Sequence, residues 1–122
     1  MLNRIKDKMI YLKENYNLEQ YNIYNVIKEI TDTTFDTTFN FIKMTYDKCN
    51  VYPYKVSPEV DNGYFLIYQQ KNIIIYVQIN EKNIKMWYNK RDGYMKPPVE
   101  EEYYETTIID DETLNFMEKI NE

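Results

Sequence analysis

Acidic side chains are concentrated at the C-terminal end of the sequence, where they suit the binding of a positively charged partner. Residues 97–122 contain nine carboxylates and one base, whereas residues 1–96 contain fourteen bases and eleven acids. A surface that is so polarised attracts basic molecules and repels nucleic acid. We therefore expect a protein partner with a basic surface. The candidate partner-binding residues are Glu100, Glu101, Glu102, Tyr103, Tyr104, Glu105, Asp110, Asp111 and Trp87.

The same acidic run also has a structural interpretation. Alternation along a strand places Glu101 and Glu105 on one face and Glu100 and Glu102 on the other. Charge on both faces suits an edge strand, because charged side chains discourage pairing with another chain. From the sequence, the run is therefore either a binding surface or a device that protects the edge of a sheet.

Trp87 predicts a second kind of site. Alternation places it on the same strand face as Lys85 and opposite the apolar side chains of Ile84 and Met86. An exposed tryptophan there is a candidate interface anchor, and the other interpretation is that an N-terminal helix covers it. An alternative function is a small-ligand binder that sequesters nucleotides. In that case Trp87 stacks on the base and Lys85 or Arg91 contacts the phosphate.

A third hypothesis is a nucleic-acid-binding module. Five bases lie on or beside the strand that carries the tryptophan: Lys82, Lys85, Lys90, Arg91 and Lys96. The chain as a whole has a net charge of −5, however. Phosphate contacts require a net basic face, so the composition argues against direct binding of nucleic acid. We favour the interpretation that these lysines solvate the outer face of the strand.

The residue types that most catalytic and metal sites need are missing. The sequence has no histidine, which excludes Ser-His-Asp and Cys-His sites. Cys49 is the single cysteine and has no histidine to activate it, so we expect a structural thiol. One cysteine without histidine makes no usual zinc site, and neither glycine belongs to a phosphate-binding loop motif. The sequence therefore predicts no enzymatic activity, no metal and no cofactor.

Helices are predicted in the first third of the chain. Apolar residues at Ile5, Met9, Leu12 and Tyr16 keep helical spacing. A second helix is predicted over 18–30, with Asn17 as its N-cap. For 32–47 the Thr, Phe and Tyr content is typical of a strand, whereas the apolar spacing favours a helix that Asp32 caps. We prefer the helix. The residues with helical spacing, which we place on its apolar side, are Phe35, Phe39, Ile42 and Tyr46.

Strands are predicted in the second half. Residues 50–63 form a connector, because Pro53 and Pro58 disfavour a regular element. Strands over 64–70, 73–79 and 84–89 form an antiparallel meander, and 101–109 forms a fourth strand. Asp110 then caps a final helix. The fold class is α+β: N-terminal helices, a four-stranded antiparallel sheet with its meander core at 64–89, and a C-terminal helix. Residues 1–122 form a single domain.

The amino-acid composition indicates the kind of genome that encodes the chain. Asn, Ile, Lys and Tyr supply 56 of the 122 residues and Ala is absent, a bias typical of an AT-rich genome such as that of a low-GC bacterium, its phage or a mobile element. The unpaired cysteine suits a reducing compartment, and neither a signal peptide nor a membrane span is predicted. We expect a small, soluble, cytoplasmic inhibitor that occludes its partner. A toxin-neutralising immunity protein and a phage-encoded inhibitor of host defence both fit.

Overall fold

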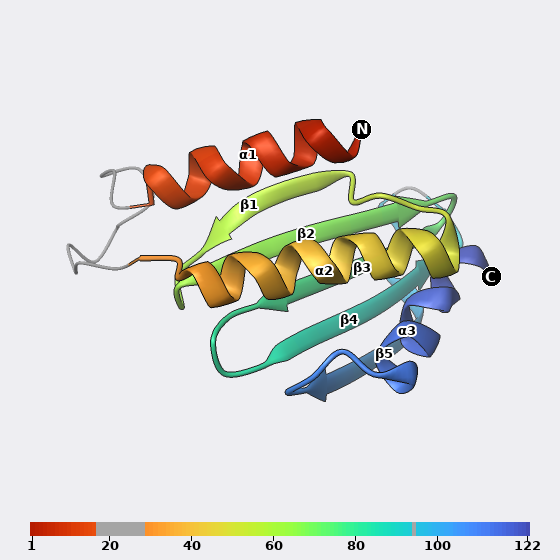
Figure 1. Cartoon of the computed structure of the whole chain (residues 1–122). Helices are drawn as coiled ribbons and strands as arrows, with labels where there is room; N and C mark the ends of the chain where they lie inside the picture. Colours follow the sequence, from red (N-terminus) through yellow and green to blue (C-terminus); the bar gives the residue numbers. More distant parts are fainter. Residues whose placement is uncertain (17–28, 94) are drawn as a thin grey trace.

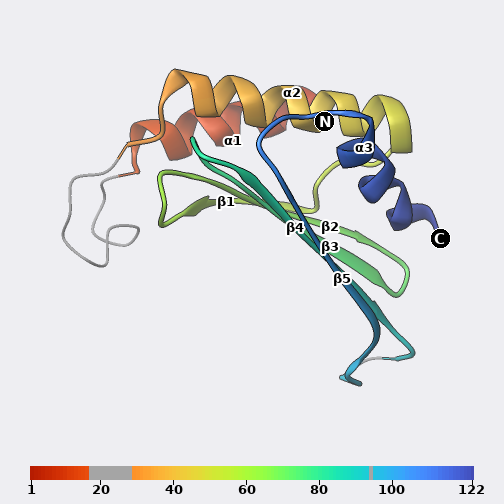
Figure 2. The ribbon, with the colours of Figure 1, turned by 90° about the horizontal axis from the view of Figure 1, so that it is seen from below.

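The chain folds into one layer of helices on one layer of sheet. The computed structural model describes residues 1–16, 29–93 and 95–122. In these residues, five strands form an antiparallel sheet, and three α-helices cover one of its faces (Figure 1). Figure 2 shows all three helices on the same side of the twisted sheet. The predicted α+β class, with helices at both ends of the chain, is confirmed.

The sheet is a meander in sequence order, with β1 and β5 at its edges. The predicted meander over 64–89 is confirmed, because its alternating apolar residues and Asn-containing turns select antiparallel neighbours. The strands are β1 Lys55–Glu59, β2 Gly63–Gln70, β3 Ile73–Ile79, β4 Ile84–Arg91 and β5 Pro98–Thr106.

Two predictions about strands were wrong. The connector predicted over 50–63 contains β1, which makes five strands instead of four. Pro58 has no backbone N–H to donate to a neighbouring strand. β1 tolerates it because an edge strand pairs with a neighbour on one side only. The last strand begins at Pro98 and ends at Thr106, three residues earlier at each end than predicted.

The first helix, α1, spans Leu2–Glu14 and runs beside β1 (Figure 1). Ile5, Met9, Leu12 and Tyr16 are all buried, as their spacing predicts. Most of the helix predicted over 18–30, including its cap at Asn17, lies outside the described residues. Residues 29 and 30, which are described, are not helical.

The second helix, α2, spans Asp32–Cys49 and confirms the helical interpretation of this segment. Its N-cap is Thr31 rather than the predicted Asp32, since the Thr31 hydroxyl accepts a hydrogen bond from the Thr34 amide at 3.2 Å. Its buried face is also shifted from the predicted one, so that Phe35, Phe39 and Tyr46 are only partly buried or exposed. The residues that α2 buries are Thr34, Thr38, Phe41, Ile42, Thr45 and Cys49.

The C-terminal helix, α3, spans Asp111–Met117 and continues into a 3-10 helix, η1, at Glu118–Asn121. Asp110 caps it as predicted. Its carboxylate accepts a hydrogen bond from the Thr113 amide at 2.9 Å, and the Thr113 hydroxyl completes a capping box. The same amide holds the pKa of Asp110 below its ordinary value, since it stabilises the charged form.

Buried tyrosines connect the helices to the sheet. The Tyr64 hydroxyl of β2 donates to the Met9 carbonyl of α1 at 2.6 Å, and the Tyr16 hydroxyl donates to the Glu59 carbonyl of β1. The Tyr16 oxygen also accepts from the Asn62 amide at 3.0 Å. These bonds attach α1 to the β1–β2 hairpin, where apolar packing alone would leave hydroxyls unsatisfied.

We predict that Gly63→Ala destabilises the fold. A Cβ atom there would lie 1.9 Å from the carbonyl oxygen of Ile79 on the neighbouring strand. Because backbone atoms cannot give way cheaply, the free energy of unfolding should fall by about 1–3 kcal/mol. Gly93→Ala is the matched control, since its Cβ would meet only the flexible Lys96 side chain at 3.5 Å. Urea denaturation compares the two variants, and equal stabilities would contradict the packing described here.

We also predict that stability declines in alkaline solution. Burial, and then the carboxylates of Glu122 and Glu100, raise the pKa of Tyr88 to about 12, and burial raises the pKa of Tyr64 and Tyr68 further. These tyrosines stabilise the fold fully at a pH below the tyrosine pKa of the unfolded chain, about 10. Their stabilisation is lost as the pH rises through their pKa values in the folded protein. Urea midpoints should fall steeply above pH 10 and change only slightly from pH 8 to 9.5, where ionisation of the Cys49 thiol in the unfolded state has a smaller effect. Tyr88→Phe should reduce this slope.

Candidate binding surface on the open face of the sheet

The face of the sheet opposite the helices carries a continuous row of apolar side chains. Strand pairing places Ile67, Tyr76, Trp87 and Tyr103 directly opposite one another across β2, β3, β4 and β5. We call these four residues the apolar row. Ile67, Tyr76 and Trp87 alternate with neighbours that are buried under the helices, and Tyr103 pairs with Trp87, so the row faces outwards.

The aromatic rings of the apolar row support each other. The Trp87 and Tyr103 ring centroids are 5.4 Å apart, and Phe65 of β2 stacks on Tyr76 with centroids 5.8 Å apart. These contacts leave the rings partly accessible, and Tyr103 is 52% exposed. In an antiparallel sheet with one solvated face, apolar side chains that point into the core normally alternate with polar side chains that point into solvent. This open face departs from that pattern at its centre, which is typical of an interaction surface.

The rows on either side of the apolar row become polar towards β5. One runs from Phe65 through Gln78 and Lys85 to Glu105, and the other runs from Gln69 through Ile74 and Asn89 to Glu101. Both rows end in a glutamate on β5, so the acidic side chains lie at one edge of the open face. Glu105 is positioned by the Asn83 side-chain amide, which donates to its carboxylate at 3.0 Å. An apolar centre with a polar rim is the usual anatomy of a protein interface.

The structure divides the predicted acidic surface between two faces. Glu101, Tyr103 and Glu105 lie on the open face beside Trp87. Glu102 is on the helix-covered face and forms an ion pair with Lys119 of η1 at 2.5 Å. Glu100, on that same face, accepts a hydrogen bond from Tyr88 at 3.4 Å.

The remaining predicted residues have local roles near the C-terminal helix. Tyr104 stacks on Phe116 of α3, with ring centroids 5.7 Å apart. Asp110 is occupied as the N-cap of α3. Asp111 is exposed in the first turn of that helix, where the helix dipole favours an acid. Of the predicted set, Trp87, Glu101, Tyr103 and Glu105 are therefore the ones that share the open face.

Neither of the N-terminal helices that the structure describes, α1 and α2, covers Trp87, and most of the helix predicted over 18–30 lies outside the described residues. The helices that the structure describes all lie on the other face of the sheet (Figure 2). The alternation that separates Trp87 from Ile84 and Met86 was read correctly, and Ile84 and Met86 are buried beneath the helices. Trp87 itself remains partly exposed next to a shallow hollow of about 280 Å³ that Tyr103 also lines.

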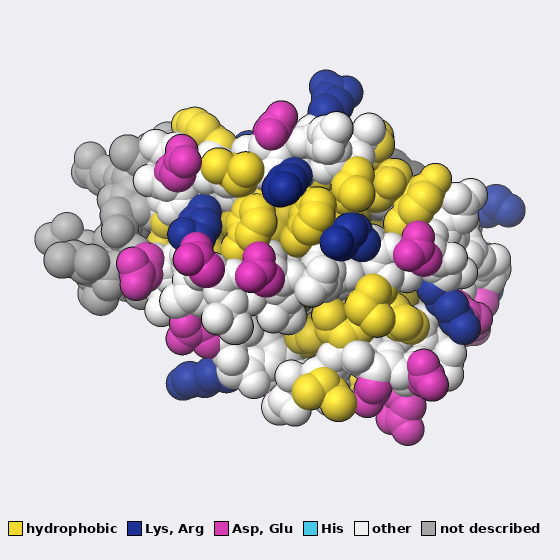
Figure 3. Space-filling model, in the orientation of Figure 1, with side chains coloured by type: hydrophobic (Ala, Val, Ile, Leu, Met, Phe, Trp, Pro, Cys, Tyr) yellow, Lys and Arg dark blue, Asp and Glu magenta, His cyan; other side chains and the backbone are white. Residues whose placement is uncertain are grey.

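On the helix-covered face, basic side chains lie over the apolar surface. Figure 3 shows hydrophobic side chains along the seam between α1 and α2, with Lys and Arg side chains lying across them. Lys6 and Lys43 both place their ammonium groups over the Phe39 ring, 5.4 and 5.0 Å from its centroid. Their aliphatic stems thereby shield the apolar seam, as long basic side chains commonly do.

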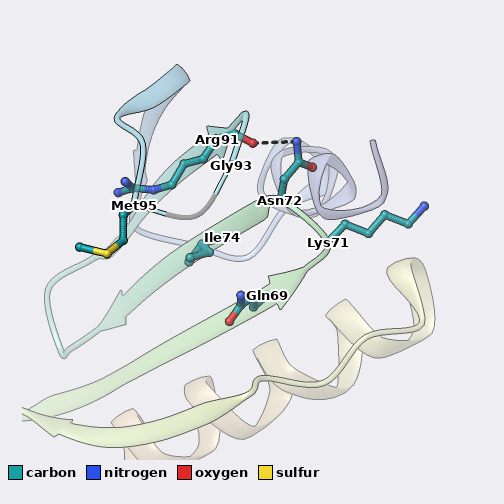
Figure 4. Close-up of a pocket in the computed structure, with 7 residues that line it drawn as sticks. All are labelled: Gln69, Lys71, Asn72, Ile74, Arg91, Gly93 and Met95. Carbon is teal, nitrogen blue, oxygen red and sulfur yellow. Dashed lines mark hydrogen bonds between the residues drawn. The ribbon is translucent and has the colours of Figure 1, made fainter.

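The residues of the alternative ligand site form a line instead of a cluster. Lys85, Trp87 and Arg91 point outwards from one strand, with Lys85 about 7 Å and Arg91 about 13 Å from Trp87 along it. Arg91 lines a hollow of about 460 Å³ at the end of the sheet, with Ile74 and Met95 (Figure 4). Its guanidinium already donates to the Lys96 carbonyl at 2.6 Å.

Sequence reasoning missed the contributions of β2 and β3 to the open face. Phe65, Ile67 and Tyr76 were not among the candidate residues. The signal was present, because the runs Tyr64–Tyr68 and Ile73–Val77 are apolar at almost every position. Such runs indicate strands that are apolar on both faces.

Within the described residues, no three side chains of the types that ligate metals come together as a metal site would require. Cys49 is buried, and burial followed by the nearby Glu118 raises the pKa of its thiol. A raised pKa lowers the thiolate fraction at neutral pH, so the geometry gives Cys49 a packing role. No helix among the described residues has the length and apolar character that crossing a membrane takes.

Comparison with known proteins identifies no relative. The chain matches no protein-family model, no curated protein and no solved structure.

We predict that the Cys49 thiol reacts slowly in the native protein. Burial against the core and a raised pKa both reduce its reactivity. A disulfide reagent at pH 7.5 should label it at least about tenfold more slowly in buffer than in concentrated urea. Equal rates in the two solvents would show that the thiol is accessible and activated, and its packing role would be rejected.

Proposed function

We propose that this chain is a non-enzymatic protein-binding protein that occludes a partner with its open sheet face. The observation that carries the proposal is the apolar row of Ile67, Tyr76, Trp87 and Tyr103, which is aligned across four strands and faces away from the helices. Tryptophan and tyrosine are enriched among the residues that dominate binding energy. Burial of this row would remove from water the most apolar part of the open face.

The acids at the β5 edge of this face favour basic side chains on the part of the partner that meets this edge. Glu101 and Glu105 both lie at the β5 edge of the open face, and the C-terminal segment adds further acids beyond it. Basic side chains on a partner would meet these carboxylates while its apolar side chains covered Trp87. Rim charges of this kind act mostly by accelerating encounter and by orienting the partner.

Stoichiometric inhibition is the activity we infer for such a surface. The chain has 122 residues and lacks histidine, so general acid–base catalysis at neutral pH lacks its usual group. A small binding protein acts by covering a functional surface of its partner. The AT-rich residue usage supports a low-GC bacterium, its phage or a mobile element as the source. An immunity protein and a phage inhibitor of host defence are the two forms that this proposal takes.

Truncation of the aromatic anchors tests the proposed face. Trp87→Ala and Tyr103→Ala should each weaken partner binding by at least about 2 kcal/mol, with little change in melting temperature because both rings are partly exposed. Tyr11→Ala is the matched control, since Tyr11 on α1 is 48% exposed and Tyr103 is 52% exposed. Immobilised wild type and variants are compared for retention of proteins from a low-GC bacterial lysate. Equal retention by all four proteins would contradict the proposal.

Paired charge neutralisation separates binding from folding. Glu101→Gln with Glu105→Gln should slow association with the captured partner roughly tenfold at low salt, and the effect should shrink in high salt. Glu100→Gln with Glu102→Gln is the matched pair on the other face, where it removes contacts to Tyr88 and Lys119. That second pair should lower thermal stability and leave association nearly unchanged. Surface plasmon resonance and thermal denaturation measure the two effects, and the reverse assignment would refute the proposed face.

A further inference from the structure

A third hollow lies at the opposite edge of the sheet from the acidic strand. Its volume is about 670 Å³, and it is enclosed by the N-terminal turns of α1 and by the segment that leads from α2 into β1. Figure 1 shows these two segments side by side at the N-terminal end of α1. Arg4 and Lys8 of α1 and Tyr52, Tyr54 and Lys55 of the second segment are among the residues that line the hollow.

The charged side chains of this hollow are all positive. Arg4 and Lys8 are one turn apart on α1, which places them on the same side of the helix. Lys55 borders the hollow as the first residue of β1, but its pairing with Ile67 places its side chain on the open face. No acid lines the hollow, and the ion pairs found in the described part of the chain involve other bases. Arg4 and Lys8 therefore attract an anion to the hollow, and they do so in a protein with a net charge of −5.

The start of α1 adds to this positive potential. The first turn of the helix contains no acid, and no side chain caps its N-terminus with a hydrogen bond. The first amide groups of a helix point outwards and carry partial positive charge. Arg4 occupies this turn, where an acid would ordinarily be favoured.

An exposed aromatic ring stands at the rim. Tyr54 is 74% exposed, although its backbone is fixed by a hydrogen bond from its amide to the Ile67 carbonyl at 2.6 Å. Tyr52, two residues earlier, stacks on Tyr46 with ring centroids 4.1 Å apart. The segment is thus held by its neighbours while the Tyr54 ring is free to receive a planar group. Stacking of a nucleobase on such a ring is a general mode of recognition.

We propose that this hollow binds a nucleoside polyphosphate. Arg4 and Lys8 contact the phosphate chain, and the Tyr54 ring stacks on the base. Guanidinium and ammonium groups are the usual partners of phosphate oxygens in proteins. The site is separate from Trp87 and Arg91, so it neither requires nor excludes a protein on the open face.

Calorimetry without divalent metal tests the ligand class. ATP, inorganic triphosphate, AMP, adenosine and a short single-stranded oligonucleotide are titrated into the full chain at low and moderate salt. ATP and triphosphate should bind, AMP should bind more weakly and adenosine should not bind, because the phosphates supply most of the attraction. Affinity should fall as salt increases.

Substitutions then test the location. Arg4→Gln and Lys8→Gln should each weaken ATP binding about tenfold. Lys71→Gln, which makes the same change of charge beside the hollow that Arg91 lines, should leave it within about twofold of wild type. Tyr54→Ala should weaken ATP and leave triphosphate unchanged, since only ATP carries a base. Trp87→Ala should have no effect, which separates this site from the proposed protein-binding face.

Three results would overturn the proposal. The first is the absence of heat for both ATP and triphosphate with folded protein. The second is ATP binding that survives the combined Arg4→Gln and Lys8→Gln substitutions or depends on Arg91. The third is tighter binding of the oligonucleotide than of ATP, lost on the same combined substitutions, which would assign the hollow to single-stranded nucleic acid. Thermal melts of each variant confirm that the protein compared is folded.

Discussion

The described helices pack against a single face of the sheet. Because side chains alternate between the two faces along each strand, every second residue contacts the helices. Tyr64, Leu66, Ile75 and Met86 enter the core because they point towards α1, α2 and α3. Their immediate neighbours along the strands are left on the other face. The apolar row is therefore a direct consequence of strands that are apolar at successive positions while only one of their faces is covered.

Apolar side chains on a solvated face add little to stability, although their burial would be worth about 25 cal/mol per Å² of apolar area. Contacts between neighbours recover only part of this stabilisation, through pairs such as Trp87 with Tyr103 and Phe65 with Tyr76. On the helix-covered side, by contrast, Lys6 and Lys43 cover Phe39. Among the described residues, the apolar row of the open face has no such cover from basic side chains, which supports a binding role for it.

Basic side chains lie near one edge of the sheet and acidic side chains lie near the other. The β1 edge carries Lys55 beside Arg4 and Lys8 of α1, and the β5 edge carries Glu101 and Glu105. The strand order fixes this polarity, because a meander places its first and last strands farthest apart. An acidic protein can in this way present a basic hollow for phosphates and an acidic rim for a protein without conflict between the two.

The sequence predicted elements whose signals are local. The meander followed from alternating residues and turns, and the Asp110 cap followed from an acid before an apolar helix. β1 was missed because Pro58 is a breaker in a central strand and is tolerated only at an edge. Alternation correctly separated Glu100 and Glu102 from Glu101 and Glu105. It could not tell which face the helices cover, because that depends on contacts such as Tyr64 with Met9 that are distant in sequence.

Hydroxyl-radical footprinting with mass spectrometry, on the free protein and on its complex with a captured partner, tests the open face most directly. The account predicts that Trp87, Tyr76 and Tyr103 are oxidised in the free protein and protected together in the complex, whereas Tyr11 on α1 is oxidised equally in both. Protection of Tyr11 with no change at Trp87 and Tyr103 would place the partner on the helices and contradict the account.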